Sequence, residues 1–168
     1  MNNNPLVSIL INNYNYEPFL KKAIDSALNQ TYSSIEVIVV DDGSTDNSRE
    51  VISRYGDKII PVFKENGGQA SAFNAGFAAS QGDIICFLDS DDLFLPEKVT
   101  DVVQACGDRE EVGWCFHQLK LVDKTLADIN NQKSFINGSR GNFSRQYDLT
   151  KQIKKGKADK NFPYTSTS

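Results

Sequence analysis

The chain alternates four short apolar segments with four segments of helical character, and this order restricts the fold more than any other feature. The apolar segments cover 6–11, 37–40, 58–63 and 84–88, and the segments expected to be helical cover 17–30, 46–54, 69–80 and 96–105. A repeated strand–helix order predicts a parallel sheet with helices on both faces. The predicted fold class is therefore α/β, a doubly wound and mostly parallel sheet.

Local signals support these segments. Within 17–30, apolar residues recur at helical spacing, and Pro18 fits the first turn, where its missing N–H is not needed. Residues 37–40 are apolar without alternation, as expected for a strand that is buried on both faces. Asp46 is predicted to cap the second helix, and Gly82 is predicted to stop the third.

A cluster of polar residues follows each predicted strand. The four clusters are Asn12–Asn13–Tyr14–Asn15, Asp41–Asp42–Gly43–Ser44, Asn66–Gly67–Gly68 and Asp89–Ser90–Asp91–Asp92. In doubly wound sheets, ligands bind beyond the carboxyl ends of the strands. We therefore expect the four clusters to meet at one edge of the sheet and to form a binding cleft there.

The last cluster places three carboxylates within four residues, at the mouth of a buried strand. Two unit charges about 4 Å apart repel by about 1 kcal/mol in water and by about 4 kcal/mol at an effective dielectric constant of 20. A cleft lined by Asp89, Asp91, Asp92 and Asp42 would store such repulsion, and a divalent cation would remove it. Carboxylate ligands with open coordination positions suit Mg²⁺ or Mn²⁺. One of Asp91 and Asp92 could instead cap the helix near Pro96, but three carboxylates exceed what a cap needs.

The segment from Asp41 to Asp46 can also be explained as a turn followed by a helix cap, with Gly43 supplying backbone freedom. On that view Ser44 or Asp46 is structural, whereas Asp42 is free to accept hydrogen bonds from a base or a ribose. The glycines of 65–76 resemble a phosphate cradle, but the segment lacks the Gly-Lys-Ser/Thr of a P-loop.

Composition excludes several classes of protein. The 168 residues are enough for one domain with a sizeable core. A net charge of −4 and the lack of a long Lys/Arg face argue against a nucleic-acid partner. Apolar runs of about five residues are far shorter than the roughly 20 that a membrane helix needs.

The first ten residues have no basic region before their apolar stretch and predict a strand, not a signal peptide. The three cysteines form no CxxC pair, which favours buried thiols in a cytoplasmic protein.

The pattern weakens near the C-terminus. Residues 112–122 could form one more strand, and 123–168 are rich in Asn, Lys, Ser, Gly and Gln. We expect a core over 1–122 and, over 123–168, an incomplete and partly flexible second region. The basic run at 151–160 is typical of a solvated loop, although a phosphate-binding patch is the alternative.

Two stretches together resemble one family. "VSILINNYNYEPFLKKAIDSALNQTYSSIEVIVVDDGSTDNS", followed by "NGGQASAFNAGFAASQGDIICFLDSDD", is similar to the donor-binding half of family 2 glycosyltransferases, which have the GT-A fold. The resemblance covers about residues 5–120, with four motifs in the expected order. It implies a nucleotide-sugar donor, UDP-linked in most related enzymes, and a divalent cation bound through a DxD-type motif.

Site residues follow from the resemblance, position by position. Tyr14 matches a residue that lies against the base, and Asp42, or Asp41 in its place, matches the carboxylate that hydrogen-bonds uracil. Asp89 matches the residue that reaches the ribose, and Asp91 and Asp92 match metal-facing carboxylates whose order of importance stays open. The complete set of donor-binding residues implied is Asn12, Tyr14, Asp41, Asp42, Gly68, Asn74 and Asp89. Many relatives have Arg before the equivalent of Asn74, where this chain has Phe73, so the donor or phosphate contact of that Arg is not carried over.

The resemblance also implies parts that we do not find. Family members have a catalytic carboxylate that deprotonates the acceptor hydroxyl, and none of Asp123, Asp128, Asp148 and Asp159 matches it. We therefore expect the general base and the acceptor region beyond Ser168, and the chain to be a donor-binding fragment inactive in transfer. The complete enzyme would be inverting and would take a glycan or lipid-linked acceptor. A homo-oligomer and association with the inner face of the membrane are also compatible with the resemblance.

Two other functions compete with this hypothesis. A nucleotidyltransferase also combines an α/β sheet with acidic metal ligands, but it usually has a Gly-rich signature with Lys or Arg after its first strand. A receiver-like signalling domain binds Mg²⁺ through clustered Asp residues, but it needs them after the first and third strands. Here the acidic clusters follow the second and fourth predicted strands.

Overall fold

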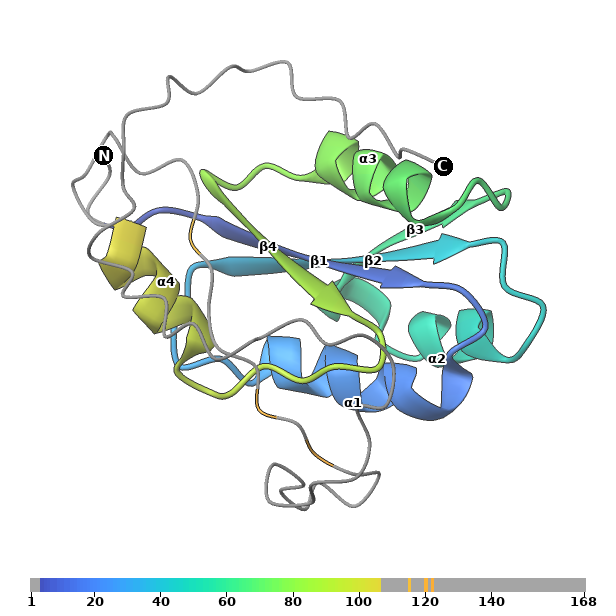
Figure 1. Ribbon diagram of the computed structural model, residues 1–168, viewed down its shortest axis with the longest axis horizontal. Coiled ribbons are helices and arrows are strands. Elements are labelled where there is room, and N and C mark those ends of the chain that lie inside the picture. The colour runs from blue at the N-terminus through green and yellow to red at the C-terminus, as the bar shows by residue number, and fades with distance from the viewer. Residues whose placement is uncertain (1–3, 107–114, 116–119, 121, 123–168) are drawn as a thin grey trace, which may run out of the picture. The chain divides into compact units, whose positions relative to one another are not determined.

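The computed structural model describes residues 4–106 together with 115, 120 and 122. Strands and helices alternate along this part of the chain (Figure 1). The strands are β1 (Val7–Asn13), β2 (Ile35–Asp42), β3 (Ile60–Lys64) and β4 (Ile84–Asp89). The helices are α1 (Glu17–Leu28), α2 (Ser48–Ser53), α3 (Gln69–Ala79) and α4 (Lys98–Cys106), with a 3₁₀ turn η1 (Gly56–Lys58) before β3.

The strands form one parallel sheet in the order β3-β2-β1-β4. The chain moves outward from β1 to β2 and β3, and then returns to place β4 on the other side of β1. Right-handed crossovers in opposite directions put their helices on opposite faces. The doubly wound α/β fold predicted from the sequence is thereby confirmed. The point at which the direction reverses lies between β1 and β4.

Each face of the sheet has its own core, as the alternation of side chains along a strand requires. On one face, Val7, Ile9 and Ile11 of β1 pack against buried residues of α1, α2 and α4. On the other face, Leu10, Ile38 and Val40 pack against Ala72 of α3. Figure 1 shows α3 alone on its side of the sheet, with α1 and α2 on the opposite side.

The strands are longer than the apolar segments that predicted them, because they include polar residues at their carboxyl ends. Asn12 pairs with Asp89 of β4 in the sheet register, and Asn13 pairs with Asp41 of β2. These residues lie in the ladder itself and not in the loops after it. Their backbones are therefore fixed by the sheet, which gives their side chains defined positions.

Two helix-end predictions differ from the structure. The N-cap residue of α2 is Asn47 and not Asp46. Helix α3 ends at Ala79, with Ser80 as its C-cap, so Gly82 is not its stop signal. A Cβ at Gly82 would lie 2.4 Å from Ser8 Oγ and 2.6 Å from Ser8 N. This glycine is needed because the chain passes so close to the start of β1.

The predicted strand at 112–122 and the predicted region 123–168 lie almost wholly outside the described residues, so the proposed domain boundary stays a prediction. In the described part of the chain, no helix has the length and apolar character that crossing a bilayer would require.

Candidate functional site

A pocket of about 400 Å³ opens at the carboxyl ends of β1, β2 and β4, where the direction of the sheet reverses. Ligands of doubly wound sheets bind in this position. It contains six of the predicted site residues together with Asn13, Tyr16, Asn66, Gln69, Ala72 and Ser90. The predicted six are Asn12, Tyr14, Asp42, Gly68, Asp89 and Asp91. The expectation that polar clusters from successive strands meet at one edge is therefore confirmed for the described residues.

Asp42 is not the unengaged carboxylate that the sequence suggested. It is 3% exposed, and its two oxygens accept hydrogen bonds from the backbone N–H groups of Gly67 (3.0 and 3.2 Å) and Gly68 (2.8 Å). Lys64 Nζ forms an ion pair with the same carboxylate. Gly68 has a φ of +80°, which favours glycine. Asp42 thus holds the loop after β3 in the shape that forms one wall of the pocket.

Asp41 belongs to the opposite face of the sheet and does not line the pocket. It is fully buried and accepts hydrogen bonds from Arg49 Nε (2.9 Å), Ser44 N (3.1 Å) and Asn13 Nδ2 (3.2 Å). The two adjacent aspartates therefore have different surroundings, because successive side chains of a strand point to opposite faces. The position of Asp41 is that of a structural hub beneath the pocket.

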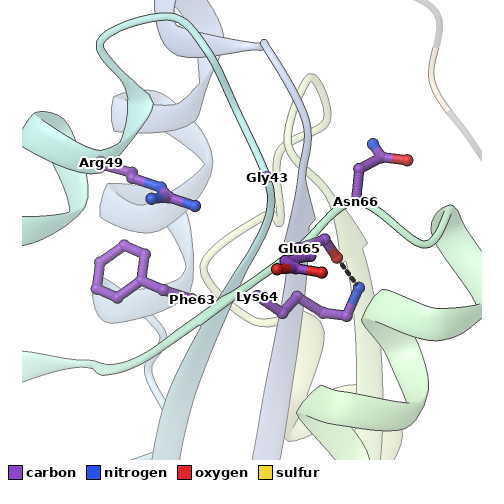
Figure 2. Close-up of a pocket in the computed structure, with 6 residues that line it drawn as sticks. All are labelled: Gly43, Arg49, Phe63, Lys64, Glu65 and Asn66. Atoms are coloured by element: carbon purple, nitrogen blue, oxygen red, sulfur yellow. Dashed lines mark hydrogen bonds between the residues drawn. The ribbon is translucent and has the colours of Figure 1, made fainter.

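A second, more open groove of about 600 Å³ lies beside β3, lined by Gly43, Arg49, Phe63, Lys64, Glu65 and Asn66 (Figure 2). The guanidinium of Arg49 lies over the Phe63 ring, 5.6 Å from its centroid, and Lys64 Nζ also donates to the Glu65 carbonyl at 2.5 Å. Both cations already pair with buried aspartates. Since Asn66 lines this groove and the pocket, we regard the groove as the outer side of the loop that Asp42 holds.

The carboxylates at the end of β4 form a pair and not the expected trio. Asp89 and Asp91 line the pocket, whereas Asp92 is exposed and does not. Asp92 N donates to the Asp89 carbonyl at 3.0 Å, which closes a turn directly after the strand. Among the described residues, no group of three or more His, Cys, Asp or Glu side chains could hold a metal ion. A cation bound by Asp89 and Asp91 would therefore need further ligands from outside this pair of carboxylates.

The remaining predicted site residues divide into two groups. Asn12 lines the pocket, and its Oδ1 atom is buried without a hydrogen-bond partner, so it is an acceptor still to be satisfied. Asn74 is exposed on α3 and does not line the pocket. The neighbouring Phe73 packs edge-on against Phe87 of β4, with ring centroids 4.8 Å apart. This contact accounts for an aromatic residue at a position where an Arg was expected from the resemblance.

The loops at the rim of the pocket are fastened to each other. Asp46 accepts hydrogen bonds from Glu17 N through Oδ2 and from Ser48 N through Oδ1, both at 3.0 Å. Desolvation alone would raise the pKa of Asp46, but these hydrogen bonds outweigh it and hold the pKa below its ordinary value. The carboxylate is therefore ionised at neutral pH and ties the start of α1 to the start of α2.

The sequence analysis did not single out Tyr16 and Gln69, whereas Asn66 belongs to the polar cluster expected after the third strand. Gln69 Nε2 donates to Asp89 Oδ1 at 3.3 Å and so joins the start of α3 to the end of β4. Tyr16 and Asn66 each lie within two residues of a predicted site residue. The repetition of tyrosine at positions 14 and 16 was the only sequence signal for Tyr16.

The chain matches the family described as "Glycosyl transferase family 2" over residues 8–165. It is 46% identical over 133 residues to an uncharacterized glycosyltransferase of Nostoc sp., covering 75% of this chain and 41% of that protein. It is 42% identical over 118 residues to one of Rickettsia typhi, covering 68% of this chain and 37% of that protein. The chain thus spans about two fifths of the length of these curated relatives.

Solved structures share the fold. A mannosyltransferase from Pyrobaculum calidifontis, in complex with GDP-Man and Mn²⁺, superposes with a TM-score of 0.58 at 25% identity, covering 64% of this chain and 34% of that chain. S. aureus TarS 1-349, in complex with UDP-GlcNAc, gives a TM-score of 0.55 at 27% identity, covering 60% and 31%. These neighbours have the GT-A fold expected from the resemblance. With its motifs at the carboxyl ends of this sheet and its match across residues 8–165, the chain belongs to glycosyl transferase family 2.

Proposed function

We propose that this chain binds a nucleoside diphosphate sugar, UDP-linked, as the donor of a glycosyl transfer. The observation that carries the proposal is the pocket between β1 and β4, in which residues from several strands and loops converge. The solved neighbours named above hold GDP-Man or UDP-GlcNAc, which supports a donor of this chemical class. In the complete protein, we expect transfer to an acceptor hydroxyl with inversion at the anomeric carbon.

Each end of the pocket suits one part of the donor. Tyr14 lines the pocket and is 47% exposed, so its ring is accessible for a base to stack on, and the unpartnered Oδ1 of Asn12 can accept a hydrogen bond from the donor. Nothing lies within 4 Å of the position that a Cβ on Gly68 would take, so the diphosphate can approach the backbone there. Asp41 and Asn74 do not line this pocket, and we do not include them in the proposed set.

The residues present also fit a divalent cation. Asp89 and Asp91 line the same pocket, and Mg²⁺ is usually bound by one or two carboxylates together with substrate phosphates and waters. Two carboxylates are therefore enough if the donor's diphosphate supplies further oxygen ligands. The cation, Mg²⁺ or Mn²⁺, would offset the negative charge of the diphosphate leaving group. Asp92 would contribute only if its side chain turned toward the pocket.

The strand order disfavours the receiver-like alternative. A receiver has the flavodoxin-like order 2-1-3-4-5, in which the first strand lies between the second and third. Here β1 lies between β2 and β4. For the nucleotidyltransferase alternative, the residues after β1 are Tyr14, Asn15 and Tyr16, with none of the glycine or basic residues that it needs.

Calorimetric titration of the chain with UDP and with GDP tests the proposal, with Mn²⁺, with Mg²⁺ and with a chelator. We expect UDP to bind in the micromolar range or better only when a cation is present. Asp89→Asn and Asp91→Asn should each weaken binding. Asp57→Asn, in the turn η1 before β3, should not, because Asp57 does not line the pocket. Equal affinity with and without chelator would remove the cation from the proposal, and no binding of either nucleotide would refute it.

A further inference from the structure

A second aromatic side chain, Tyr16, lies at the same pocket as Tyr14. Both residues line it, and their exposed fractions are 43% and 47%. Between them, Asn15 adopts a left-handed backbone with φ of 59°, which is uncommon for a residue other than glycine. Such a conformation persists only where its surroundings hold it in place.

The surroundings do hold this loop. Asn15 N donates to Ser44 Oγ at 2.9 Å, and Asn15 Oδ1 accepts from Thr45 N at 2.7 Å. Two residues further on, the backbone N–H of Glu17 donates a hydrogen bond to Asp46 Oδ2. The loop after β1 is thus tied to the loop after β2 on both sides of Tyr16, and its backbone is fixed before any ligand arrives.

The ring of Tyr16 also contacts another aromatic ring, that of Phe19. Its centroid lies 6.1 Å from that of Phe19, with the two planes inclined by 46°. The backbone carbonyl of Tyr16 accepts hydrogen bonds from Phe19 N and Leu20 N at the start of α1. A half-exposed ring on a fixed backbone can contact a ligand with little loss of conformational entropy on binding.

We propose that Tyr16 is a further binding residue for the donor, and that its ring packs on the nucleobase together with Tyr14. The inference rests on the proposed function. We expect the ring to contact the base and not the sugar, because the loop that contains Tyr16 is hydrogen-bonded to the loop after β2. Ser44, Thr45 and Asp46 follow β2, whereas the carboxylates proposed for the cation follow β4, on the other side of β1. The diphosphate joins the base to the sugar, so the base lies on the β2 side.

Affinity measurements on three variants test this role. Tyr16→Ala should weaken binding of UDP about 5- to 150-fold, the range that stacking on one aromatic ring contributes per base. Tyr16→Phe keeps the ring and should bind nearly as well as the unchanged chain. Phe77→Ala removes an aromatic residue that is 62% exposed near the far end of α3, and it serves as the matched control.

A ligand without a base separates stacking from a structural role. Pyrophosphate with Mn²⁺ should bind the unchanged chain and Tyr16→Ala equally, because it lacks the group that the ring contacts. In Tyr16→Trp, UDP should quench the fluorescence of the new indole, and pyrophosphate should not.

Each outcome decides one point. If the unchanged chain binds UDP and Tyr16→Ala binds it as tightly, the inference is wrong while the proposed function stands. If Tyr16→Ala loses UDP and pyrophosphate alike, or if Tyr16→Phe fails to restore binding, the ring does not stack on the base, and the inference is again wrong. If the unchanged chain binds neither UDP nor GDP, the proposed function fails, and this inference fails with it.

Discussion

Among single residues, the two adjacent aspartates of β2 have different roles because their side chains point to opposite faces of the sheet. Asp42 faces the pocket and holds the loop after β3 through Gly67, Gly68 and Lys64. We expect Asp42→Ala to weaken UDP binding about 10- to 150-fold, because the variant loses charged hydrogen bonds, worth about 1.5–3 kcal/mol, that hold the pocket wall in the shape proposed to bind UDP. Calorimetry on the folded variant is the measurement. An unchanged dissociation constant would show that the loop keeps its shape without this carboxylate.

Asp41→Ala should act on stability instead. The substitution removes three hydrogen bonds to a buried carboxylate, from Asn13 Nδ2, Ser44 N and Arg49 Nε, and one hydrogen bond to a charged group contributes about 1.5–3 kcal/mol. Urea unfolding should therefore show a loss of at least that size. The matched control is Glu50→Ala, which removes an exposed ion pair with Arg54 and should cost no more than about 1 kcal/mol. Equal midpoints for the two variants would contradict the assignment of Asp41 as a structural hub.

Much of the pocket could be predicted from sequence because its residues directly follow apolar segments. Asn12 is the last residue but one of β1, Asp42 and Asp89 end β2 and β4, and the topology alone brings such positions together. The partners of Asp42 could not be predicted, since Lys64 lies 22 residues away and meets it only through the pairing of β2 with β3. For Asn74, the resemblance placed the residue beside the donor, but its position on α3 leaves it exposed outside the pocket.

At the scale of elements, the packing of α3 on the sheet depends on a residue without a side chain. A Cβ at Gly76 would lie 3.1 Å from Val40 Cγ2 and 3.5 Å from Leu10 Cδ1. Gly76→Val should therefore overpack this core and cost about 1–3 kcal/mol in the free energy of unfolding. The control is Ala78→Val on the exposed side of the same helix, which measures the loss of stability from a β-branched residue in a helix without any overpacking of the core. A Gly76→Val variant as stable as Ala78→Val would mean that α3 can move away from the sheet freely.

Element types were easier to predict than element ends. Every helix and strand predicted within residues 4–106 is present, because hydrophobic spacing reports which segments are buried. The ends depend on hydrogen bonds that spacing does not encode. Strand β2 extends to Asp42 because its polar side chains have partners in the fold. Asp46 looked like a helix cap, yet its carboxylate also binds the N–H of Glu17, a residue 29 positions away.

At the scale of the whole molecule, the order of the strands explains why one pocket forms and where. The alternation of strands and helices predicted a doubly wound sheet, but it did not distinguish which strands are neighbours. That order depends on which faces the crossovers cover, and hence on the packing of α1 and α2 against one face and α3 against the other. With β1 between β2 and β4, the side proposed for the base and the carboxylates proposed for the cation fall on the two sides of a single strand.

The last prediction concerns what these 168 residues do alone. The carboxylates that line the pocket are Asp42, held by Lys64 and two backbone N–H groups, and Asp89 and Asp91, proposed for the donor and cation. With these proposed roles, none of the three carboxylates that line the pocket among the described residues is left to deprotonate an acceptor, and general-base catalysis contributes about 10²–10⁴-fold. Positioning of the second substrate can supply about 7–11 kcal/mol of a barrier.

We therefore expect the chain to bind UDP-sugars but to release UDP from them only slowly, by hydrolysis. Release would be followed with a panel of UDP- and GDP-linked donors, with and without glycan and lipid-linked acceptors, and Asp89→Asn would give the background rate. An acceptor should leave the rate unchanged, because the proposed site holds only the donor. Acceptor-dependent turnover on the order of 1 s⁻¹ or faster, as in ordinary enzymes, would contradict this and place the general base within these residues.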